Sequence, residues 1–219
     1  MTAIPVSTFD LLVRDRDTAY AECGDAARAA RLLPRFIGLG LAGFLAHAAA
    51  MGLMHAVSPD ALGATDDPLR FGGRVFLAYA GAFFGTNIAA LPTFYFHALM
   101  AGMRTHGWRI SVEVMRAQAT EATVLLGLLP ALLAAGVGAA LMGLELWADA
   151  ALALGFLLPF VAGLPGSLGL LSTLRRLAEE AQPEDHIHRD ATPTLLALAW
   201  CTLFTVMAPV GVWGIFNML

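Results

Sequence analysis

Histidines inside apolar sequence are the first residues of this chain that could do chemistry. His47, His55 and His97 stand in or beside long apolar stretches. Two histidines that face each other within a membrane can ligate a haem iron, and His47 and His97 are the candidates for such a pair. Counted from the predicted cytoplasmic helix ends, however, their depths differ by roughly 7 Å at 1.5 Å per residue. We therefore predict no cofactor and interpret these histidines as packing or interfacial residues.

A second group of potential ligands occupies residues 184–190, EDHIHRD. Its histidines, His186 and His188, and its three carboxylates are of types that transition metals bind. Their spacing matches no metal-binding motif. We therefore predict a solvated loop without a metal, and His186 and His188 are the ligands that a metal would use.

Catalytic and ion-coupling patterns are missing from the sequence. There is no His-Glu-x-x-His motif, no phosphate-binding loop and no nucleophile elbow. The apolar runs contain no charged residue near their centres, and Glu113, Glu121 and Glu145 fall at or beyond the expected helix ends. Ion-coupled transporters keep ionisable residues deep in the bilayer. We predict that the protein is not an enzyme and is not ion-coupled.

The composition requires a lipid solvent for most of the chain. Of 219 residues, 58% are apolar and 14% are charged, against roughly 25% charged in an average soluble domain. The net charge of −4 and the absence of like-charge runs exclude nucleic acid as an expected partner. All 13 basic residues are arginines, a bias that we interpret as that of a bacterial genome.

Five apolar runs predict an all-α fold, a polytopic transmembrane helix bundle of about five spans with short cytoplasmic N-terminal and interfacial helices. A cytoplasmic segment, residues 1–35, precedes one transmembrane domain, residues 36–219. Its expected spans are residues 36–56, 75–103, 121–142, 150–173 and 193–216. The fourth run is interrupted at residues 163–169, GLPGSLG, which predicts a bent or split helix. Small residues at four-residue spacing, among them Gly81, Gly85, Ala134 and Gly138, would let helices approach closely.

The distribution of arginines predicts the orientation. The segments expected on one side of the membrane hold 11 arginines, and the opposite side holds two, Arg70 and Arg74. Because basic loops stay on the cytoplasmic side, we predict a protein of the bacterial inner membrane with a cytoplasmic N-terminus and an external C-terminus.

Two polar segments on the predicted cytoplasmic side are suited to docking. The N-terminal segment mixes acids with its arginines, so it is not the polybasic helix that binds anionic lipid. Docking against the bundle's own loops or against a partner suits it better. The candidates for partner docking are Phe9, Arg14, Arg16, Trp108, Arg109, Arg175 and Arg176.

The order of these parts resembles that of the bacterial Yip1-like membrane proteins. The resemblance rests on an opening STFDLLVRDRD at Ser7 to Asp17, five spans, ALPTFYFHALMAG at Ala90 to Gly102 in the long second run, and a short exit tail. It implies a non-enzymatic protein that recruits partners to membranes, and it assigns no functional residue.

From these observations we expect an anchoring or accessory subunit of a larger inner-membrane complex. Its partners would be membrane lipids and other membrane subunits, with a homo-oligomer as a further option. One alternative is a small channel or permease for a neutral or weakly charged solute, with a path along Thr86, Asn87 and Thr93 and the broken fourth span. A second alternative is a haem-bearing electron-transfer subunit.

Overall fold

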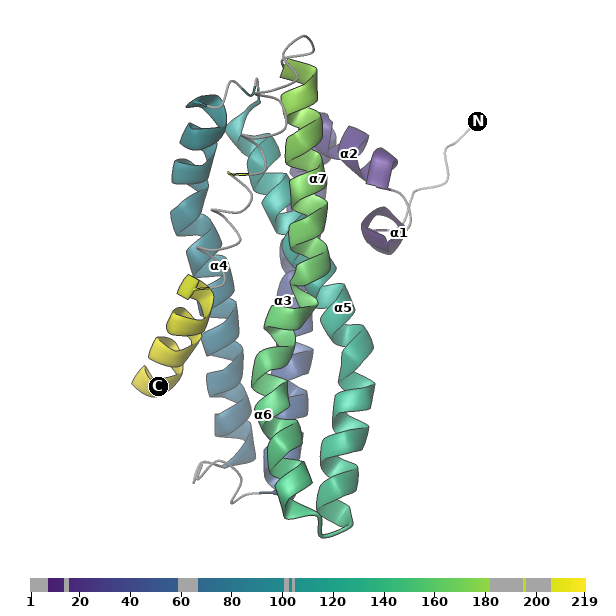
Figure 1. Cartoon of the computed structure of the whole chain (residues 1–219), viewed down its shortest axis with the longest axis vertical. Helices are drawn as coiled ribbons and strands as arrows, with labels where there is room; N and C mark the ends of the chain where they lie inside the picture. The colour runs from purple at the N-terminus through teal and green to yellow at the C-terminus, as the bar shows by residue number, and fades with distance from the viewer. Residues whose placement is uncertain are drawn as a thin grey trace.

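The part of the chain described in the computed structural model is all-α. It comprises residues 8–13, 16–58, 67–100, 103, 105–181, 195 and 206–219. The helices are α1 (Thr8–Val13), α2 (Arg16–Gly24), α3 (Ala26–Val57), α4 (Pro68–Met100), α5 (Gly107–Leu141), α6 (Glu145–Ala162) and α7 (Leu164–Ala181). A further helix, Val206–Met218, is called the C-terminal helix below. Figure 1 shows the long helices side by side along one axis, with the C-terminal helix beside α4.

Four helices within the described residues are long and apolar enough to cross a membrane: α3, α4, α5 and the continuous stretch Glu145–Glu180 that contains α6 and most of α7. Each has 32 to 36 residues, hence a length of roughly 50 Å at 1.5 Å per residue. The hydrocarbon core is only about 30 Å thick, so each helix is long enough to extend beyond it. Of the predicted fifth span, residues 193–205 lie outside the described residues except for Leu195. The C-terminal helix alone is shorter than a crossing.

Two long helices begin well before their apolar parts. α3 starts at Ala26, where the Asp25 carboxylate accepts a hydrogen bond from the Arg28 N–H at 2.9 Å, so the predicted boundary at residue 35 falls inside a helix. The stretch expected to be a separate interfacial helix, residues 104–120, belongs from Gly107 onward to α5. Hydropathy marks only the apolar part of a helix, whereas caps and buried ion pairs let the backbone continue through polar sequence.

The fourth apolar run is split, as predicted. α6 ends at Ala162, Gly163 lies between the two helices, and α7 begins at Leu164. Pro159 and Pro165 stand on either side of this junction, and each removes a backbone donor from the helical ladder. The helix changes direction here while the chain continues along the bundle (Figure 1).

Glycines at three helix crossings bring backbones together. A Cβ added to Gly43 of α3 would lie 2.6 Å from the Cβ of Ala122 in α5, and one added to Gly52 would lie 2.9 Å from the carbonyl oxygen of Pro68 in α4. A Cβ on Gly166 of α7 would collide with the carbonyl oxygen of Ala117 in α5. Such contacts are how helices associate closely in lipid.

The glycines predicted to mediate close approach behave differently. Gly85 and Gly138 have open space where a Cβ would be, so their backbones are not in close contact with another helix. Gly81 does face a neighbour, since its added Cβ would lie 3.1 Å from Ile215 Cδ1 in the C-terminal helix. Of the three glycines that the four-residue spacing singled out, one therefore faces a neighbouring helix at close range.

The two N-terminal helices dock at the end of the bundle where α5 begins and α7 ends (Figure 1). The Tyr20 O–H donates to the Glu180 carboxylate at 2.7 Å, and the Arg109 guanidinium lies 4.5 Å from the centroid of the Tyr20 ring. Arg176 forms an ion pair with Asp17. Cys23 of α2 is fully buried, and this burial, together with the Glu113 carboxylate, raises the pKa of its thiol to about 12.

Prediction for the α5–α7 crossing: Gly166→Ala lowers stability, because the new methyl group overlaps the Ala117 carbonyl and the overpacking costs about 1–3 kcal/mol. Thermal unfolding of the detergent-solubilised protein, followed by tryptophan fluorescence, measures the change. Gly169→Ala on the same helix is the matched control, because its Cβ would meet open space. Equal unfolding midpoints for the two variants would contradict the close approach.

Prediction for the docked N-terminal helices: in a Cys201→Ser variant, native Cys23 reacts with a maleimide at least about tenfold more slowly than in the denatured protein. The thiolate is the reactive form, and a pKa near 12 leaves very little of it at neutral pH. Tyr20→Ala accelerates labelling more than Tyr20→Phe, which keeps the ring under Arg109. Identical native and denatured rates would show that α2 is not docked.

Candidate functional site

A cavity of about 380 Å³ lies between α4, α5, the α6–α7 junction and the C-terminal helix. Most of its wall is apolar, with Val114, Leu157 and Leu170 among its residues. The ring centroids of Phe83 and Phe160 lie 5.5 Å apart at one end of the cavity. This volume is at the lower end of the range for small-molecule sites.

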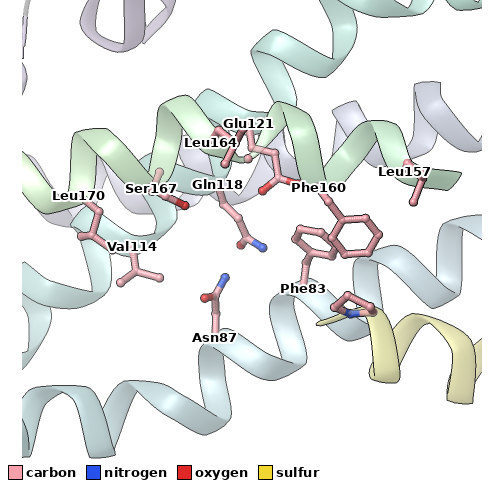
Figure 2. A pocket seen from close by; sticks show the side chains of 13 residues that line it. Phe83, Asn87, Val114, Gln118, Glu121, Leu157, Phe160, Leu164, Ser167 and Leu170 are labelled. Carbon is pink, nitrogen blue, oxygen red and sulfur yellow. The ribbon is translucent and has the colours of Figure 1, made fainter. Parts of the chain in front are cut away.

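Three polar side chains from two helices enter this cavity. Asn87 of α4 and Gln118 and Glu121 of α5 are buried, with 2%, 4% and 3% of their surfaces exposed. Figure 2 shows the amides of Asn87 and Gln118 pointing toward each other from opposite walls, with the Glu121 carboxyl directed into the same space beside Phe160. Ser167 of α7 lines the same cavity.

Several polar atoms at this site are buried without a hydrogen-bond partner in the described part of the chain. They are both amide atoms of Gln118 and Oε1 of Glu121. Native proteins satisfy nearly all buried polar groups, so each exception calls for an explanation. Water or a ligand in the adjoining cavity would complete their hydrogen bonds.

The break in the fourth span forms the wall next to the carboxyl group. A Cβ added to Gly163 would lie 3.5 Å from Cδ and Oε2 of Glu121. Three residues later, Gly166 of α7 is in backbone contact with Ala117. The α6–α7 junction therefore lies next to Glu121, and the close approach of α7 to α5 requires a glycine at position 166.

Buried charge inside the bundle corrects a prediction from the sequence. Glu113 and Glu121 lie in the interior of α5 and are buried, rather than at or beyond a helix end; Glu145, the first residue of α6, does lie at one. The prediction failed because α5 continues through residues that hydropathy had assigned to an interface. The observation that argued against ion coupling is thereby removed.

The first of these carboxylates is paired. Glu113 Oε2 accepts a hydrogen bond from Arg116 Nε at 2.7 Å, and Arg116 Nη2 donates to Thr173 Oγ1 of α7 at 2.9 Å. Through Thr173 this pair links α5 to α7, about one to two turns of α5 before Glu121. Arg116 is the buried arginine nearest to Glu121 along α5, and its guanidinium is already hydrogen-bonded to Glu113 and Thr173.

The two haem candidates are not brought together. His47 is fully buried in α3, edge-on to Tyr79 of α4 with ring centroids 5.4 Å apart. His97 is exposed on α4, and its Nδ1 is 2.8 Å from the carbonyl oxygen of Thr93. It lies 18 residues beyond Tyr79, about 27 Å along the helix axis. The two imidazoles could not ligate one iron in this arrangement.

The other predicted site residues have mixed outcomes. His186, His188 and Arg14 lie outside the described residues, as do the side chains of Phe9 and Arg16. Arg109 and Arg176 contact α2 of the same chain, and Trp108 is half-buried beside His106. Arg175 is exposed on α7. Among the described residues there is no group of three or more His, Cys, Asp or Glu side chains that could hold a metal.

Comparisons with protein-family models, with curated proteins and with solved structures give no match for this chain. The resemblance to Yip1-like proteins therefore stays a prediction from sequence. The function has to be argued from the cavity itself.

Sequence reasoning named Asn87 and the broken fourth span but missed Gln118 and Glu121. The signal was present, because Val114, Ala117, Gln118 and Glu121 recur at helical spacing and share one face of α5. Extending the third span backward by four turns would have aligned this face with the bundle. The charged residues at positions 113 and 116 concealed that continuity.

Prediction for the buried ion pair: Arg116→Leu destabilises the protein by roughly 3–5 kcal/mol, because it leaves the Glu113 carboxylate buried without its cation. The double variant Glu113→Leu/Arg116→Leu loses much less, since no uncompensated charge remains. Unfolding in mixed detergent micelles measures both. Direct pairing would be ruled out if the stability lost by the double variant equals the sum of the losses of Arg116→Leu and of Glu113→Leu measured separately.

Proposed function

We propose that this chain is a small membrane permease that binds a neutral or weakly charged solute in the cavity between α4, α5 and the α6–α7 junction. The observation that carries this proposal is the set of buried polar atoms on Gln118 and Glu121 that line the cavity and have no hydrogen-bond partner among the described residues. Unpaired polar groups within a bundle are costly. Substrate pathways are the sites where such a cost is commonly retained.

The arrangement of helix ends supports a cytoplasmic N-terminus in a bacterial inner membrane. The N-terminal helices, the start of α5 and the end of α7 lie together, and this end carries Arg28, Arg109 and Arg176. Arg70 and Arg74, at the start of α4, are at the other end (Figure 1). Positive charge gathered at one end is the pattern of a cytoplasmic face.

The depth of the cavity agrees with a step in transport. α3 and α5 run side by side in the same direction, with Gly43 against Ala122. Glu121 therefore lies about 9 Å from the level of Phe36, the first residue of the predicted first span, at 1.5 Å per residue. In the proposed orientation the solute would sit in the cytoplasmic half of the membrane.

An accessory-subunit role is less well supported than the permease. Two of its proposed docking residues, Arg109 and Arg176, are engaged with α2 of the same chain. The internal contacts explain the charge pattern without a partner protein. A broken helix beside a cavity that contains unpaired polar groups has no comparable explanation from an accessory role.

Prediction for solute passage: reconstituted vesicles should admit at least one of urea, glycerol and butylammonium faster than protein-free vesicles, as measured by stopped-flow light scattering. Ser167→Leu should reduce that flux to the lipid background, because the larger side chain fills the cavity. Asn87→Ala should change the relative rates of the three solutes by removing an amide from the wall.

Ser172→Leu is the matched control, since Ser172 lies on the same helix outside the cavity. This variant should transport as the unmodified protein does. Vesicles that swell no faster with protein than without it, for all three solutes, would refute the permease.

A further inference from the structure

We propose that the cavity takes a small primary ammonium ion with an apolar body, and that this cation exchanges with a proton at Glu121. The inference rests on the proposed function and names its class of solute. It is carried by the buried carboxyl group of Glu121, the amides of Gln118 and Asn87 and two aromatic rings, which line one cavity with no cationic side chain among the described lining residues.

The charge of the cavity points to a cationic ligand. Glu121 is the one ionisable side chain among the described lining residues. An ionised carboxylate that is buried without a partner is too costly to persist, so it has to carry a proton or face a cation. The described residues that line the cavity include no cation, and Arg116, five residues before Glu121, is already paired with Glu113 and Thr173.

The groups facing Glu121 from neighbouring helices do not provide that cation either. On α3 the nearest titratable residue is His47, which packs against Tyr79 and does not line the cavity. On α4 the cavity receives the neutral Asn87, while the Tyr79 O–H donates to the carbonyl oxygen of Phe156. From α6, α7 and the C-terminal helix, the described wall contains no titratable side chain, and Ser167 is its polar residue.

The arrangement of acceptors matches a primary ammonium group. Such a group carries three N–H donors. The carboxyl of Glu121 and the amide oxygen of Gln118 are acceptors in the cavity wall. The Asn87 amide, whose nitrogen faces Gln118 in Figure 2, has its oxygen as a third acceptor. Phe83 and Phe160 add ring faces, which attract cations. The apolar wall formed by Val114, Leu157 and Leu170 would surround the organic part of the ligand.

The exchange balances in charge and atoms. An ammonium ion enters the cavity, the protonated carboxyl of Glu121 releases its proton to water, and the resulting carboxylate pairs with the ammonium. The reverse sequence reloads the proton when the ligand leaves. The bundle therefore carries the same net charge in both states, which keeps the desolvation cost of each state low.

Isothermal titration calorimetry of the full chain in detergent tests this exchange with benzylamine and with neutral benzamide as probes. Benzylamine is protonated at pH 7, as alkyl amines are. Titration in two buffers of different ionisation enthalpy should show about one proton released per benzylammonium bound, and none for benzamide. Glu121→Gln should abolish this release and weaken benzylamine binding at least about thirtyfold, while leaving benzamide binding within about threefold.

The controls separate the site from folding and from nonspecific charge. Glu179→Gln removes an exposed carboxylate of α7 and should leave both probes unaffected. Glu121→Asp keeps a carboxyl group, so it should retain proton release even if Glu121→Gln folds poorly. Equal binding of the two probes, unchanged in Glu121→Gln, would overturn the ammonium inference and leave the permease standing. Binding of neither probe, nor of the smaller butylamine and butanamide, would also overturn the ammonium inference, while the flux of urea and glycerol decides the permease separately.

Discussion

The backbone contact between α7 and α5 at Gly166 and Ala117 is the constraint on which the rest of this bundle depends. At that point no side chain separates the two helices. α6 and α7 therefore cannot continue as one straight helix and still cover both ends of α5, and the direction changes at Gly163. The same contact brings the α6–α7 junction over Glu121 and Thr173 within reach of Arg116.

The cavity follows from how unevenly the other helices approach one another. Near Gly52, α3 and α4 meet backbone to backbone. Near Gly40, the Phe84 ring stands between them, with its Cζ 3.0 Å from the position of an added Cβ. α4 is thus held close at one end and spaced by a phenyl ring near the other. Asn87, one turn beyond Phe84, then faces open volume rather than a neighbouring helix.

The long apolar helices and the split of the fourth run could be predicted from sequence, because both depend on local features. Lipid solvent requires long apolar helices, and two prolines flanking a glycine interrupt one. The continuity of α5 could not be predicted in the same way. Its charged residues look interfacial until Thr173, 57 positions after Arg116, is known to lie beside it. Gln118 and Glu121 were missed for the same reason, since their burial depends on where α7 packs.

The docked N-terminal helices contribute to the burial of the Glu113–Arg116 pair. Leu12 of α1 lines a small recess together with Glu113, Arg116 and Gly166, so the docked helices keep water from the pair. In that shielded position the attraction between the charges is stronger than it would be in water, and an undocked α1 would expose it to screening. The contacts of Tyr20 with Glu180 and Arg109 hold α2 against α5 and α7. They therefore help to keep the Glu113–Arg116 pair shielded. Ala117 and Leu170 line both this recess and the cavity, so the surroundings of the docked N-terminal helices and the wall of the cavity share residues of α5 and α7.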